Sequence, residues 1–92
     1  MQQQCQLGLG AGRTDLICRD NDGNFVVLEL KAVHSSDGVV GQILRYMSFV
    51  RENWAKAQGK DVRGIILTLS FDEQLRLAAA EAGIKVLRVG IQ

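Results

Sequence analysis

Proline is absent from the sequence, and histidine and cysteine are rare, with one and two residues respectively. Zinc sites require clusters of cysteine and histidine, and Cys5 and Cys18 lack the paired spacing of zinc ligands. We therefore expect no zinc site. We interpret both cysteines as reduced thiols in the core of a cytoplasmic protein, because disulfides are rare in that compartment.

The sequence also lacks an excess of charge of one sign, and it has no long apolar run. The formal net charge is +1, so no overall positive field attracts nucleic acid, and any DNA contact needs a local patch. The apolar runs, such as residues 64–69, are too short to cross a bilayer, and no signal-like segment opens the chain. We expect no membrane association. Without repeats or linkers, residues 1–92 are expected to form a single domain.

The most informative stretch is the segment 26–31. Its apolar and β-branched residues predict a buried strand, and Glu29 places within it a carboxylate that is costly to desolvate without partners. Because side chains alternate along a strand, Glu29 and Lys31 are expected on the same face.

A second strand is expected at residues 12–19, joined to the first by a turn rich in aspartate, asparagine and glycine. A two-residue turn would place Asp15 opposite Leu30. A three-residue loop with Gly23 in a left-handed conformation would place Asp15 opposite Glu29 instead. We prefer the second register because it pairs apolar residues with apolar residues, whereas a slip of one residue would mix them.

In the preferred register, two carboxylates and a lysine converge on one patch of the sheet. Asp15, Glu29 and the main-chain carbonyl of Leu30 offer three oxygen ligands, which suit a hard divalent cation such as Mg²⁺. Lys31 beside the cation would position a water molecule or stabilise charge on a phosphate. On residue types alone, a cluster of cross-strand ion pairs on an exposed sheet face is an equally good interpretation.

The residues that follow predict an amphipathic helix. Apolar residues recur every three or four positions from about 38 to 57, so that one stripe of the helix is apolar. Gln42 and Tyr46 are four residues apart and are expected on a neighbouring flank.

Two further strands and a second helix are expected beyond it. Residues 62–69 and 84–89 have the apolar character of buried strands, and a capped helix is expected between them at about 71–82. A weaker strand is expected at residues 2–9. The sequence therefore predicts an α/β fold whose mixed sheet joins an antiparallel hairpin to right-handed parallel strand–helix–strand units.

These motifs together resemble a nuclease superfamily. Asp15 followed by residues 29–31 resembles the acid and the Glu-x-Lys motif of the PD-(D/E)XK nucleases, which have a restriction-endonuclease-like sheet flanked by helices. Gln42 and Tyr46 on the next helix are similar to the helix motif of its RecB-like branch. The likeness is closest to the C-terminal nuclease domain of the NucS/EndoMS mismatch endonucleases, and it runs from about residue 12 to the end of the chain.

The resemblance implies an enzyme that depends on Mg²⁺ or Mn²⁺ and hydrolyses phosphodiester bonds in DNA. Asp15 and Glu29 match the metal ligands of the family, and Lys31 matches its catalytic lysine. Gln42 and Tyr46 match the helix residues that border the site and the DNA backbone.

Other functions remain open at this stage. Arg13 resembles the arginine that precedes the family's aspartate, where a phosphate contact and a salt bridge to a local acid are both possible. A nuclease for RNA or for branched junctions would carry the same residues. A non-catalytic DNA-binding or assembly module that kept the fold is the alternative from another class.

One departure from the resemblance leads to an expectation about assembly. The helix that usually precedes the first strand is expected to be missing, since the sequence reaches that strand almost at once. Both faces of the hairpin are apolar, so the face that this helix would cover needs another partner. We therefore expect a two-fold dimer that buries this face, or the exchange of the N-terminal strand between protomers.

Overall fold

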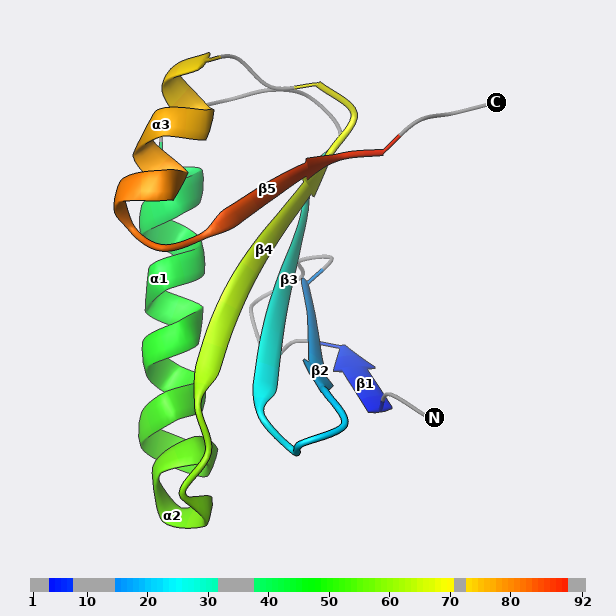
Figure 1. Cartoon of the computed structure of the whole chain (residues 1–92), viewed down its shortest axis with the longest axis vertical. Helices are drawn as coiled ribbons and strands as arrows, with labels where there is room; N and C mark the ends of the chain where they lie inside the picture. The colour runs from blue at the N-terminus through cyan, green and yellow to red at the C-terminus, as the bar shows by residue number, and fades with distance from the viewer. Residues whose placement is uncertain (1–3, 8–14, 32–37, 71–72, 90–92) are drawn as a thin grey trace.

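The computed structural model describes residues 4–7, 15–31, 38–70 and 73–89, with the backbone alone at residues 4–7, 15 and 31. The described strands form one five-stranded sheet in the order β1-β2-β3-β4-β5 (Figure 1). They are β1 (Gln4–Leu7), β2 (Asp15–Arg19), β3 (Phe25–Lys31), β4 (Val62–Thr68) and β5 (Lys85–Arg88). β1, β2 and β3 pair antiparallel, whereas β3, β4 and β5 pair parallel. This mixed sheet confirms the expected fold class.

The described helices connect the parallel strands. α1 (Val39–Val50), the π-helical segment η1 (Arg51–Ala55) and α2 (Lys56–Gln58) lie between β3 and β4, and α3 (Glu73–Glu81) lies between β4 and β5. They confirm the two expected helices, although the π-helical segment was not predicted. Residues 35–37, which were expected to start the first helix, lie outside the described residues, as do residues 1–3 before the first strand. Within the described part of the chain, no helix is both long and apolar enough to cross a membrane.

The β2–β3 hairpin has the register that the sequence favours. Asp15 is the Cα partner of Glu29, which confirms the three-residue loop over the two-residue turn. Gly23 has a φ of 84°, in the left-handed region. The N–H of Asp20 donates to the carbonyl oxygen of Asn24 at 2.9 Å and closes the loop.

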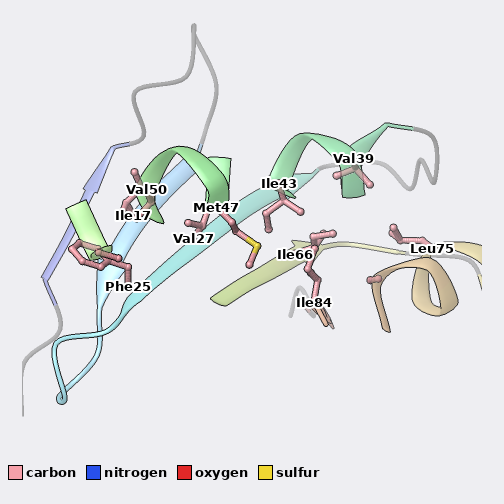
Figure 2. Close-up of a cluster of buried hydrophobic side chains, with 12 residues drawn as sticks. Ile17, Phe25, Val27, Val39, Ile43, Met47, Val50, Ile66, Leu75 and Ile84 are labelled. Atoms are coloured by element: carbon pink, nitrogen blue, oxygen red, sulfur yellow. The ribbon is translucent and has the colours of Figure 1, made fainter. Parts of the chain in front are cut away.

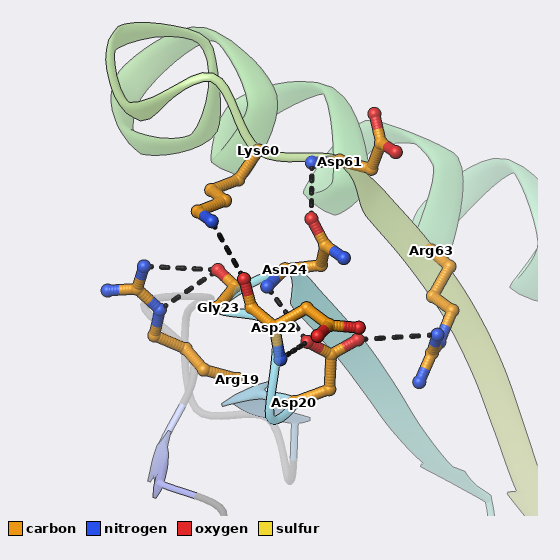
Figure 3. A network of polar contacts seen from close by, with 8 residues as sticks. All are labelled: Arg19, Asp20, Asp22, Gly23, Asn24, Lys60, Asp61 and Arg63. Atoms are coloured by element: carbon orange, nitrogen blue, oxygen red, sulfur yellow. Dashed lines mark hydrogen bonds and ion pairs between the residues drawn. The ribbon is translucent and has the colours of Figure 1, made fainter.

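The carboxylate of Asp20 holds this turn together (Figure 3). Its Oδ1 accepts hydrogen bonds from the N–H groups of Asp22 and Asn24, both at 2.9 Å, and its Oδ2 lies 3.5 Å from Nη1 of Arg63 on β4. Desolvation raises the pKa of Asp20, but these hydrogen bonds and the positive charge of Arg63 outweigh it and leave the pKa below its ordinary value. The turn therefore loses this stabilisation as the pH falls through that pKa.

Two further side chains tie the turn to the end of α2. Nη2 of Arg19 donates to the carbonyl oxygen of Gly23 at 3.0 Å and to Oε1 of Gln58 at 2.7 Å. Nζ of Lys60 donates to the carbonyl oxygen of Asp22 at 2.7 Å. Because Gln58 and Lys60 are distant from the hairpin in sequence, tertiary contacts reinforce the conformation that the turn residues favour.

Buried apolar side chains fill the space between the helices and one face of the sheet (Figure 2). They include Ile17, Phe25, Val27 and Ile66 from the sheet, Val39, Ile43, Met47 and Val50 from α1, and Leu75 from α3. α1 lies close to β4 at Gly64, where a Cβ would lie 2.7 Å from Sδ of Met47 and 3.1 Å from Cδ1 of Ile43. This glycine therefore sets how near the helix lies to the sheet.

The other face of the sheet carries a second apolar set, which we call the uncovered face. Its described members are Leu16, Val26, Leu28, Leu30, Ile65, Leu67 and Leu87. Figure 1 shows α1, α2 and α3 on the opposite side of the sheet, so no helix of the described residues covers this face. Leu30 and Leu87 are 38% and 43% exposed, whereas Val26 is 7% exposed and the remaining four are partly buried.

The expectation of two reduced thiols is wrong for Cys18. This residue is 3% exposed and disulfide-bonded, and the described residues contain no free cysteine. Cys5 is the only other cysteine of the chain, and the β1–β2 register makes its Cα the partner of the Cys18 Cα. Directly opposed residues of antiparallel strands have Cα atoms about 4.5–5.5 Å apart, which suits a disulfide. Sequence spacing missed this bond because it depends on strand pairing.

The hairpin register generates a prediction about Gly23. Gly23→Val should lower the free energy of unfolding by about 1–3 kcal/mol, because a β-branched residue resists the positive φ of this position. Urea denaturation of the two proteins measures the difference.

Gly41→Ala provides the matched control. Gly41 lies in α1 with ordinary helical φ, and nothing lies within 4 Å of the Cβ that the substitution adds. This variant should be up to about 1 kcal/mol more stable than the wild type, because alanine favours the helix. A Gly23→Val variant as stable as the wild type would contradict the assigned turn.

Candidate active site

The candidate site is centred on Glu29, near the end of β3. Glu29 is 2% exposed and alternates with Val27 and Phe25, so it belongs to the face of the sheet that the helices cover. The register places the Asp15 backbone directly opposite on β2. A carboxylate with so little contact with water is costly to keep in a sheet, which favours a role beyond packing.

Lys31 follows two residues after Glu29 and ends β3. Its position therefore belongs to the same set of alternate residues as Glu29. Leu30 lies between them and contributes to the opposite, uncovered face. That its main-chain carbonyl binds a metal ion stays a prediction. The backbone thus brings together the positions of Asp15, Glu29 and Lys31.

Gln42 and Tyr46 lie on α1, which packs against β3 and β4. Both residues are partly buried, and Tyr46 packs against the hydrophobic core. The N–H of Gln42 donates to the carbonyl oxygen of Gly38 at 2.9 Å, which places Gln42 in the first turn of the helix. α1 therefore presents both residues from the layer that lies over the Glu29 face. Arg13 lies outside the described residues.

Thr68 is a neighbour of the site that the sequence did not reveal. It is the Cα partner of Lys31 and is 2% exposed. Its hydroxyl donates to the carbonyl oxygen of Ser70 at 2.7 Å and so holds the chain where it leaves β4. The sequence places Thr68 near the end of a predicted strand but does not show that it lies beside Lys31, because the register of parallel strands depends on tertiary packing.

Two pockets lined by described residues lie away from this site. Two hollows of about 350 Å³ each occur near the start of β4, and Arg63 lines both of them. The first is also lined by Asn24 and Phe25, at the turn end of the hairpin. Among the described side chains, no group of three or more histidine, cysteine or acidic residues is arranged for metal binding. The side chain of Asp15 lies outside this set, so the placement of Asp15 beside Glu29 rests on the backbone register.

Comparison with known proteins identifies the family. A family model described as the endonuclease NucS C-terminal domain matches residues 5–91 of this chain. The chain therefore belongs to the endonuclease NucS C-terminal domain family.

The matching relatives are longer proteins. Endonuclease NucS of Parafrankia sp. (strain EAN1pec) is 43% identical over 75 residues, which cover 82% of this chain and 33% of that protein. Endonuclease NucS of Methanopyrus kandleri is 34% identical over 76 residues, which cover 83% of this chain and 28% of that protein. The chain thus spans about a third of the length of these relatives.

Solved structures show the same fold. A crystal structure of a repair endonuclease from Pyrococcus abyssi matches with a TM-score of 0.75 and 27% identity, covering 97% of this chain and 39% of that one. The structure of a complex of EndoMS with double-stranded DNA matches with a TM-score of 0.69 and 27% identity, covering 98% of this chain and 38% of that one. The homologues are therefore named as endonucleases, and one similar structure contains DNA.

Proposed function

We propose that this chain is a metal-dependent DNA endonuclease of the PD-(D/E)XK type, or the catalytic core of one. The observation that supports it best is the pairing of Asp15 with Glu29 on the helix-covered face of the sheet. The family of this chain and its named homologues, which are endonucleases, support the same proposal. Action on DNA supports the cytoplasmic location that we propose, whereas the disulfide of Cys18 is of a kind that is rare in that compartment.

The chemistry of the donor set fits Mg²⁺ or Mn²⁺. The carboxylates of Asp15 and Glu29 and the carbonyl of Leu30 would hold the ion, since hard cations prefer oxygen ligands and keep several waters. When bound, such an ion polarises a phosphoryl oxygen and lowers the pKa of a coordinated water. Glu29 is well suited to this role because its burial limits competition from bulk solvent.

The other residues act on the substrate. The ammonium group of Lys31 stabilises the negative charge that develops on the phosphate as a water oxygen attacks phosphorus and the bond to the leaving oxygen breaks. Gln42 and Tyr46 border the site and contact the DNA backbone from α1. Arg13 contributes a phosphate contact beside Asp15.

Metal binding separates this proposal from a non-catalytic module. Mn²⁺ at about 100 times its dissociation constant should stabilise the wild type by about 2.7 kcal/mol, measured as a rise in melting temperature. Glu29→Gln should abolish this rise, because it keeps the shape of the side chain but removes a charged ligand. Glu52→Gln, at an exposed residue paired with Lys56, should respond to Mn²⁺ as the wild type does. A wild type that binds DNA but shows no response to Mn²⁺ would favour the non-catalytic module.

Cleavage assays test the chemistry itself. Asp15→Ala, Glu29→Ala and Lys31→Ala should each lower the rate on DNA by on the order of a hundredfold or more, with the fold retained. Duplex, single-stranded, branched and RNA oligonucleotides, each with Mg²⁺, Mn²⁺ or chelator, identify the preferred substrate. If the wild type cleaves DNA and Asp15→Ala cleaves it equally well, the assigned site is wrong.

We further propose that the chain forms a two-fold dimer through the uncovered face. β3 and β4 have seven residues and the other strands four or five, so the whole sheet has a projected area on the order of 400 Å². On this face Val26 is buried, four of the other apolar side chains are partly buried, and Leu30 and Leu87 are exposed. Burial of the exposed leucines against a second copy would be favourable.

A substitution on β5 tests the dimer. Leu87→Lys should shift the protein to the monomer in light scattering over a range of concentrations, because it places a charge in the uncovered face. Leu77→Lys is the matched control, since Leu77 is 52% exposed on α3 and lies outside that face. A wild type that stays monomeric at high micromolar concentration would refute the dimer.

A further inference from the structure

Three residues form one row across the carboxyl edge of the parallel sheet. Thr68 on β4 is the Cα partner of both Lys31 on β3 and Arg88 on β5. Residues in register on parallel strands belong to the same face, and this is the helix-covered face because Ile66 and Val86, two residues earlier, pack in or against the core. Arg88 therefore lies two strand spacings, about 10 Å, from the position of Lys31.

Arg88 carries a positive charge that no described residue pairs with. Its side chain is exposed, and it makes no hydrogen bond or ion pair within the part of the chain that the structure describes. Most other described cations have such partners, namely Arg19, Lys56, Lys60, Arg63 and Arg76. Among the described residues, none competes with an external anion for the guanidinium of Arg88.

The backbone of Arg88 is fixed although its side chain is exposed. The N–H of Val89 donates to the carbonyl oxygen of Thr68 at 2.8 Å, so the β4–β5 pairing continues past Arg88. The Thr68 hydroxyl is committed to the carbonyl oxygen of Ser70 and does not compete for the arginine. An arginine on a fixed strand end loses less conformational freedom on binding than one on a loop.

We propose that Arg88 binds a backbone phosphate of the DNA, a few nucleotides from the phosphate that is cut. This inference rests on the proposed nuclease function, which places the reacting phosphate beside Lys31. A separation of about 10 Å is short on the scale of a bound duplex, so Arg88 can reach a phosphate close to the one that is cut. The planar guanidinium matches phosphate oxygens with two parallel hydrogen bonds, so arginine suits this role better than lysine.

Lys85 offers a matched control on the same strand. It is an exposed cation and makes no hydrogen bond or ion pair with the described residues. It is the Cα partner of Ile65, however, and so belongs to the uncovered face, at the opposite end of β5 from Arg88. Lys85→Ala removes the same charge from β5 without changing the row that contains Arg88.

The test is the salt dependence of DNA binding, measured by fluorescence anisotropy with labelled duplexes in chelator between about 50 and 200 mM salt. Arg88→Ala should weaken binding severalfold for every duplex sequence and reduce the slope of log affinity against log salt by about 0.9, the value for one lost phosphate contact. Arg88→Lys should keep the wild-type slope with weaker binding. Lys85→Ala should bind as the wild type does, and thermal unfolding should show all variants folded.

Three other results would overturn the inference, and each has a different meaning. If the wild type binds DNA and Arg88→Ala retains both its affinity and its salt slope, Arg88 makes no phosphate contact, and the nuclease proposal is unaffected. Equal losses in Arg88→Ala and Lys85→Ala would show a general effect of net charge instead of a contact. If the wild type neither binds nor cleaves DNA, the proposed function fails and the role of Arg88 fails with it.

Discussion

The structure depends on the hydrogen bonds that fix the turn between β2 and β3. The Asp20 carboxylate accepts two main-chain N–H groups, and Gly23 takes up the left-handed conformation that a three-residue loop needs. A slip of one residue would move every side chain of β2 relative to β3, so this turn decides that Asp15 lies opposite Glu29. The candidate active site is therefore set by contacts at the other end of the hairpin.

The two faces of the sheet have different roles. One face carries the core beneath α1 and α3, with Glu29 embedded at its carboxyl end. A buried carboxylate reduces stability, and the large apolar contact between α1 and the sheet offsets that cost. The uncovered face is apolar and has no helical cover among the described residues. The disulfide-bonded Cys18 points to the same side of the sheet but is buried. We thus propose catalysis for the helix-covered face of the sheet and dimer formation for the uncovered face.

Much of this arrangement could be predicted from local sequence, and the rest could not for physical reasons. The antiparallel register followed from pairing like residues across a short turn, so the opposition of Asp15 and Glu29 was predictable. The row of Lys31, Thr68 and Arg88 was not, because helices separate these parallel strands and tertiary packing sets their register. The disulfide of Cys18 was missed since the pairing of β1 with β2 carries little sequence signal. The π-helical segment had no local signature either.

The most direct test of the central claim is a crystal structure of the chain with Mn²⁺, located by its anomalous scattering. The account predicts one Mn²⁺ within about 2.5 Å of carboxylate oxygens from both Asp15 and Glu29 and of the Leu30 carbonyl oxygen. Mn²⁺ bound elsewhere, or an Asp15 side chain directed away from Glu29 in the metal-bound crystal, would contradict it.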